Sequence, residues 1–179
     1  MKAPELLAAP LLIAFACAAA DDLPQTAVTV EVFTVALAGA DDARLVFTRS
    51  DGPLLGGVNP DQHARELASE ATVELRLIHS TSWRWEPDGR IVLTYVAWAG
   101  DGGVAADARP LPALTPPGPT DPLNPRPPEI AELDPLAHGL RHLAFLLRTS
   151  TDGVVAGALG MRACRVLEQL EPEVAGELP

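Results

Sequence analysis

The chain has 179 residues, of which 47% are hydrophobic and 21% are charged, so it has the size and composition of one globular domain. Its formal net charge is -11 at pH 7. This acidity argues against nucleic acid as a partner, because phosphate backbones are bound by basic surfaces. A nucleotide would need a metal ion or a local arginine cluster to offset the repulsion. The two cysteines, Cys17 and Cys164, do not indicate a disulfide framework.

Residues 1–22 are predicted to be an apolar leader. The apolar run ends at Cys17 and three alanines, which resembles a bacterial secretory signal, and residues 14–17 loosely match a lipoprotein cleavage sequence that would make Cys17 a lipid anchor. Pro10 and a single lysine favour instead an N-terminal helix packed on the domain, or a start codon upstream of the true one. The run is too short to predict a transmembrane helix. We expect a cytoplasmic protein, with export or lipid anchoring through Met1–Ala20 as the alternative, and a membrane partner only in the lipid-anchored case.

The first part of the domain, residues 23–106, is mostly of β character. Thr26–Ala38 begins as an alternating strand with Glu31 on its polar side and then becomes apolar on both faces, which predicts a strand in the middle of a sheet. Arg44–Arg49 is predicted to be a second strand, broken by the Ser-Asp-Gly-Pro sequence of residues 50–53.

A helix is predicted next. Asn59 is a good N-cap, Pro60 suits the first helical position, and the helix runs to about Ala71. The residues expected to face inward are Ala64, Leu67, Ala68 and Ala71. Thr72–Glu86 and Arg90–Ala99 are then predicted to form a hairpin whose second strand is buried.

The proline-rich residues 107–128 are predicted to be an extended surface connector. Two helices follow, at about Glu129–Arg148 and Val154–Leu170, and residues 129–172 are expected to pack on the same domain. The order of elements predicts an α/β fold with a mixed central β-sheet flanked by helices.

Residues 56–70 join a Gly-Gly turn to an acidic helix that contains the run Arg65-Glu66-Leu67 and then Glu70. In this the chain resembles a diverged Nudix domain, of the nucleoside diphosphate-X hydrolase-like family. The family motif is G-x5-E-x7-R-E-U-x-E-E-x-G-U, where U is aliphatic, and as an element order the likeness extends over roughly Thr26–Leu147. The resemblance implies a Nudix-like topology. It also implies hydrolysis of a nucleoside diphosphate linked to another group, with magnesium held by the helix glutamates.

The Nudix box is degenerate. The spacing from Gly57 to Arg65 is shorter than the motif requires and lacks its glutamate. Ser69 stands where the first glutamate of the E-E pair belongs, and Thr72 replaces the motif glycine. The motif is therefore only partly present.

His63, Glu66 and Glu70 would lie along one face of the predicted helix. The two carboxylates could hold a weakly bound magnesium ion that keeps most of its waters, with His63 as a further ligand. The metal would polarise a phosphoryl oxygen, and Glu66 is the candidate catalytic base. The alternative is a solvated acidic helix face, which is the usual role of such charge runs.

His138 and His142 stand four residues apart, a spacing that suits metal ligands, with Arg141 beside them. Without a third ligand, they are expected to border a pocket or to cap the edge of the sheet. Arg44, Arg141 and Arg148 would recognise a phosphate if they converge.

Trp83 and Trp85 share one face of the predicted hairpin, where they would stack a base or pack across strands. The predicted ligand pocket combines these aromatic residues with basic ones: Arg44, Trp83, Trp85, His138, Arg141 and His142.

Because the box is incomplete, a Nudix-like binding or interaction module for a nucleotide or another small molecule is favoured over an enzyme. One alternative is a magnesium-dependent diphosphate hydrolase that uses Glu66 and Glu70. The other is an exported or lipid-anchored envelope protein. Weakly bound magnesium is the cofactor expected.

Overall fold

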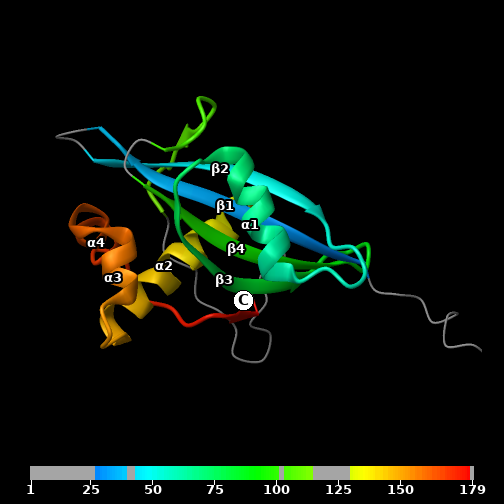
Figure 1. The fold of residues 1–179 in the computed structure, drawn as a ribbon. Helices are drawn as coiled ribbons and strands as arrows, with labels where there is room; N and C mark the ends of the chain where they lie inside the picture. Colours follow the sequence, from blue (N-terminus) through cyan, green and yellow to red (C-terminus); the bar gives the residue numbers. More distant parts are fainter. Residues whose placement is uncertain (1–26, 40–42, 101–102, 115–129, 178–179) are drawn as a thin grey trace, which may run out of the picture.

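A computed structural model describes residues 27–39, 43–100, 103–114 and 130–177. The predicted leader and most of the proline-rich connector lie outside these described residues. Figure 1 shows a single sheet with helices on both of its faces. Within the described ranges, no helix is long and apolar enough to cross a membrane.

The sheet has six strands in the order β5-β2-β1-β4-β3-β6. The strands are β1 (Val28–Ala38), β2 (Arg44–Pro53), β3 (Leu75–Trp85), β4 (Ile91–Ala99), β5 (Arg109–Pro110) and β6 (Gly176–Glu177). The helices are α1 (Pro60–Ala71), α2 (Asp134–Thr149), α3 (Val154–Leu159) and α4 (Met161–Leu167). The central pair β1–β4 and the edge pair β3–β6 are parallel, and the other pairs are antiparallel. This confirms the predicted α/β fold with a mixed central sheet flanked by helices.

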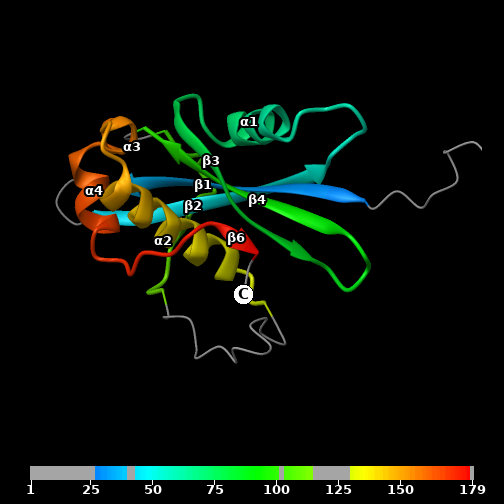
Figure 2. The same ribbon diagram turned by 90° about the horizontal axis from the view of Figure 1, so that it is seen from below.

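Helix α1 covers one face of the sheet, and α2 covers the other (Figure 2). The apolar side of α1 packs Ala64, Leu67 and Ala68 against Val30 and Val32 of the central strand. These are the inward-facing positions expected from the sequence. Burial of both faces of β1 explains its long apolar run, because a central strand between two helix layers has no solvent side.

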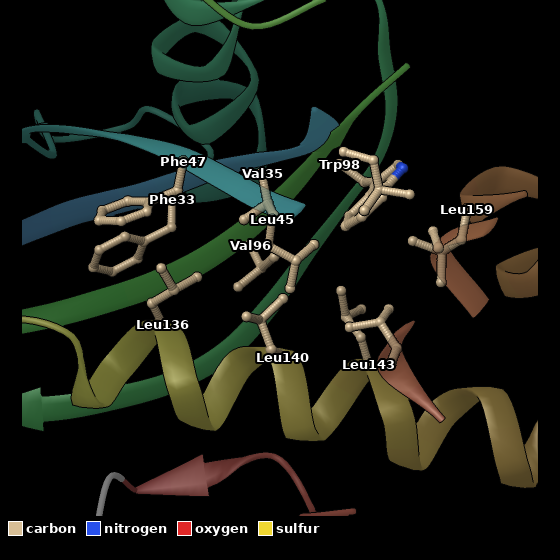
Figure 3. Close-up of a cluster of buried hydrophobic side chains, with 13 residues drawn as sticks. Phe33, Val35, Leu45, Phe47, Val96, Trp98, Leu136, Leu140, Leu143 and Leu159 are labelled. Atoms are coloured by element: carbon tan, nitrogen blue, oxygen red, sulfur yellow. The ribbon is translucent and has the colours of Figure 1, made fainter. Parts of the chain in front are cut away.

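The larger core lies between the sheet and α2. Figure 3 shows Leu136, Leu140 and Leu143 of α2 against side chains of the sheet that include Phe33 and Trp98. Gly139 faces the sheet, and a methyl group there would collide with Val96 of β4. The glycine therefore lets α2 pack closely on the strands.

Three predicted boundaries are wrong. Residues 50–53 do not break β2, because they pair with β1 as far as Thr29 opposite Pro53, and the ladder outweighs the local turn preference. Helix α2 begins at Asp134, directly before a proline that suits the first turn. The last predicted helix is divided into α3 and α4 at Gly160, whose φ of 80° interrupts the helix.

Candidate functional site

The start of α1 is fixed by its N-cap. The Asn59 side chain accepts hydrogen bonds from the backbone N–H groups of Asp61 and Gln62, at 2.8 and 3.3 Å. The hydroxyl of Tyr95 on β4 donates to the Asp61 carboxylate at 2.7 Å and ties the first turn to the sheet. The predicted cap and the predicted helix start at Pro60 are confirmed.

The glutamate carboxylates of α1 point to solvent. Glu66 and Glu70 are both exposed. Glu66 accepts a hydrogen bond from Gln62 at 3.0 Å, and Nδ1 of His63 lies 3.7 Å from its other oxygen. The Ser69 hydroxyl donates to the main-chain carbonyl of Glu66 at 2.6 Å. Among the residues that the structure describes, no group of three or more His, Cys, Asp or Glu side chains is placed to hold a metal ion.

His63 is partly used in packing. Its Nε2 is buried without a hydrogen-bond partner among the described residues, beside the backbone of Gly52 on β2. A methyl group on Gly52 would lie 3.1 Å from that nitrogen. The ring thus presents only Nδ1 toward Glu66.

A second polar cluster lies on α2, on the side that faces β3 and the residues around Glu173. His138, Arg141 and His142 are buried there, with His138 and His142 each only 4% exposed. The structure adds His79 from β3 and Glu173 from the C-terminal segment, which we define as residues 168–177. Figure 2 shows this segment running back along α2 to the edge of the sheet at β6. We call His138, Arg141 and His142 the α2 cradle.

His79 and His142 form a stacked pair. Their ring centroids are 5.1 Å apart, and their Nε2 atoms are 3.1 Å apart. Nδ1 of His142 lies 3.1 Å from the main-chain oxygen of Glu173, and a carbonyl only accepts, so this nitrogen carries the hydrogen. In the neutral ring Nε2 of His142 is then the acceptor, and His79 donates to it. Burial lowers the pKa of both histidines, which agrees with a neutral pair.

Glu173 is the residue on which the α2 cradle converges. One carboxylate oxygen lies 3.2 Å from Nδ1 of His138, and the other lies 3.5 Å from Nη1 of Arg141. The backbone N–H of Glu173 also donates to the carbonyl of Arg141 at 3.2 Å. His138, first, and Arg141 lower the pKa of the Glu173 carboxyl, which favours its charged form beside the Arg141 guanidinium. Neither ring nitrogen of His138 makes a hydrogen bond among the described residues, so Nδ1 approaches Glu173 without hydrogen-bond geometry and Nε2 has no partner.

The structure divides the predicted pocket residues between the two faces of the sheet. Trp83 stands opposite Leu93, which packs with the α1 core, so Trp83 and Trp85 project on the α1 side, 37% and 40% exposed. Arg44 is exposed at the start of β2, and alternation from Gly52 places it on the α1 side as well. His138, Arg141 and His142 are brought together on the opposite side.

A buried ion cluster in the sheet escaped the sequence analysis. Glu31 of the central strand is 1% exposed, which overturns its expected position on a polar side. Arg84 lies 2.8 Å from one oxygen of Glu31, and Arg49 lies 2.7 Å from the other. The Thr94 hydroxyl donates to Glu31 at 3.0 Å. A lone carboxylate in an apolar strand was the available signal, because such a charge needs a buried partner.

The sequence analysis also missed His79 and Glu173. His79 stands two positions after Leu77 in the predicted strand, so a histidine in line with an apolar residue was a usable signal, although a register shift puts Leu75 on the other face. Glu173 lies one residue beyond the predicted end of the domain at residue 172, and no local pattern marks it.

Arg148 of α2, which was expected to join a phosphate site, has another role. Its guanidinium donates to the main-chain oxygens of Glu168 and Leu170, both at 2.9 Å. It therefore anchors the beginning of the C-terminal segment to α2.

Comparison with known proteins adds no relative to this description. No protein-family model matches the chain, and no curated protein matches it at a significant level.

Proposed function

We propose that the chain is a Nudix-like domain without a complete catalytic box, and that it binds a nucleotide or another small molecule. The observation that carries the proposal is the state of the box helix α1. It lies between a strand pair and a hairpin, with its apolar side on the sheet, and this element order supports the proposal. Its two remaining box carboxylates, Glu66 and Glu70, project into solvent, and the serine between them bonds to its own helix backbone.

The residue set of α1 fits a magnesium ion only weakly. Glu66 and Glu70, with Nδ1 of His63, would hold it, and the ion would supply polarisation of a phosphoryl oxygen. Magnesium gives up its waters reluctantly and is held in proteins by clustered carboxylates and phosphates. With Ser69 in place of a glutamate, two exposed carboxylates offset little of that cost. This supports a binding role over hydrolysis.

The test is a panel of nucleoside diphosphates and nucleotide sugars, titrated into the protein by calorimetry and assayed in parallel for phosphate release with magnesium. We expect saturable binding to at least one compound and no release above the protein-free rate. Magnesium-dependent release that is lost in both Glu66→Gln and Glu70→Gln would instead establish the hydrolase. Glu171→Gln is the matched control, because Glu171 is an exposed glutamate on the C-terminal segment. This variant should behave as the wild type in both assays.

We place this function in the cytoplasm, because the proline and the single lysine of the leader fit a secretory signal poorly. Mass spectrometry of the mature protein checks this, and a chain that begins at Cys17 would contradict it.

A further inference from the structure

We propose that the α2 cradle is a binding site for the phosphate group of a small molecule, and that Glu173 occupies this site as a tethered competitor. The proposal deepens the binding function proposed above and rests on it. It assigns a ligand chemistry and a position, on the face of the sheet opposite the box helix.

Three polar side chains of one helix converge on a single residue. His138, Arg141 and His142 stand at i, i+3 and i+4 and therefore share one face of α2. Nδ1 of His138 and Nη1 of Arg141 face the two carboxylate oxygens of Glu173, and Nδ1 of His142 donates to its main-chain oxygen. An anionic group is thus already held at this place, and it belongs to the chain itself.

The fit of Glu173 is loose. Its two contacts of 3.2 and 3.5 Å exceed the roughly 2.7–2.9 Å usual for charge-assisted N–H···O bonds. Two oxygens in one plane are shared among donors that would suit the three oxygens of a phosphate. If the segment leaves, Nδ1 of His142 loses its carbonyl partner and becomes a third donor for the ligand.

The site also has unused hydrogen-bonding capacity in a dry environment. His138 is 4% exposed, and neither of its ring nitrogens makes a hydrogen bond among the described residues. A buried polar atom without a partner is costly, so the position favours a ligand or water that supplies an acceptor or a donor. The permanent charge of Arg141, also buried, gives the cradle the local cation that an anionic ligand needs on an acidic chain.

The C-terminal segment has the features of a detachable cover. Its side chains at Glu171, Pro172 and Val174 are exposed, and its only strand is the two-residue β6. Arg148 holds its beginning through two main-chain oxygens. Beyond Leu170, which packs on the core, the segment is mostly exposed, and such segments open at a lower free-energy cost than the core, so a ligand competes with a weakly held neighbour.

Calorimetric titration with inorganic phosphate at constant ionic strength tests the proposal. A site that is open about a tenth of the time shows an apparent affinity reduced about tenfold. We therefore expect Glu173→Ala to bind phosphate at least about tenfold more tightly than the wild type. Glu171→Ala removes the same charge from an exposed position of the same segment and should leave the affinity unchanged. The gain should disappear when Arg141→Gln is added to Glu173→Ala.

A second variant approaches the same question without touching the cradle. Arg148→Met loosens the anchor of the segment and should also raise the phosphate affinity. If Glu173→Ala does not fold by circular dichroism, Glu173→Gln keeps the side-chain volume and carries the same comparison against Glu171→Gln. Equal phosphate affinities of the Glu173 variant and its Glu171 control would overturn the proposal.

Failure of the broader function gives a different result. One outcome is that no nucleotide binds the wild type, while Glu173→Ala binds phosphate more tightly and loses this gain when Arg141→Gln is added. This result would support the phosphate site in the α2 cradle and contradict the nucleotide-binding function. If a nucleotide binds the wild type and Arg141→Gln does not weaken it, the cradle is wrong and the binding function stands.

Discussion

At the scale of single residues, Glu31 explains how a carboxylate is tolerated in the central strand. It lies between Arg84 and Arg49 and accepts from the Thr94 hydroxyl, so its charge is compensated where water is excluded. Arg84 in turn bonds to Glu86 at 2.8 Å. Removing Arg84 would leave the buried carboxylate with Arg49, whose side chain is 35% exposed, as its remaining ion partner, and such a loss costs more than the removal of an exposed pair.

Arg84→Met should therefore destabilise the protein clearly, but by less than the about 3–5 kcal/mol that an unpaired buried charge costs, because Arg49 still contacts Glu31. Arg90→Met is the control, because its contact with Asp88, although only 2.6 Å long, is solvent-exposed on both sides. Exposed pairs of this kind contribute about 0–1 kcal/mol. Urea unfolding at pH 7.5 measures both variants, and equal losses in the two would contradict the account of the ion cluster.

The His79–His142 pair makes stability depend on pH. Burial, the largest cause, lowers the pKa of both rings from 6.5, although Asp61 opposes this at His79 and the Glu173 carbonyl opposes it at His142. As pH falls below 6.5, the unfolded chain takes up protons that the folded pair does not. The pair's contribution is thus complete above pH 6.5 and is lost as pH falls from there toward the lowered values. Glu173, with a pKa below 4.5, adds its own loss only at more acidic pH.

We expect the free energy of unfolding to decrease between pH 7.5 and pH 5.5, and the decrease to be smaller in His79→Gln. The glutamine keeps a donor toward His142 but takes up no proton. Urea titrations at the two pH values give the slope. An unchanged slope in His79→Gln would show that the pair does not carry this dependence.

At the scale of elements, the sequence predicted the helix starts and turns that depend on neighbouring residues in the chain. Asn59 and Pro60 marked the start of α1, and the hairpin of β3 and β4 followed from its alternation and its Pro-Asp-Gly turn. The end of β2 could not be predicted this way, because its last residues are held by partners on β1 that are distant in the sequence. The break between α3 and α4 was missed because one glycine within an apolar run is compatible with a helix until its conformation is known.

Two glycines of this region should respond oppositely to alanine. Gly160 has φ 80° and ψ 160°, a region reserved for glycine, so Gly160→Ala should cost about 1–3 kcal/mol. Gly157 lies within α3 with open space around its Cα, so Gly157→Ala should stabilise by up to about 1 kcal/mol. Chemical unfolding of both variants checks the division of the helix, and a gain from Gly160→Ala would contradict it.

At the scale of the whole molecule, the sheet separates two candidate sites. Glu66 and Glu70 stand on α1, on one face, and the α2 cradle stands on the other (Figure 2). The sequence placed His138, Arg141 and His142 on one helix face correctly. It could not show their convergence on Glu173, because that contact needs the chain to pass through α3 and α4 and return along α2. Spacing within a helix is local information, whereas the partner of a helix face is set by tertiary packing.

The most direct measurement of the binding account is an NMR titration of histidine-labelled Glu173→Ala with inorganic phosphate. The chain has four histidines, and they report on both sites, with His63 on α1 and the other three at or beside the α2 cradle. We predict saturable shifts of the His138 and His142 ring resonances, with His63 unchanged. A shift of His63 alone, or no shift at any histidine, would contradict the account.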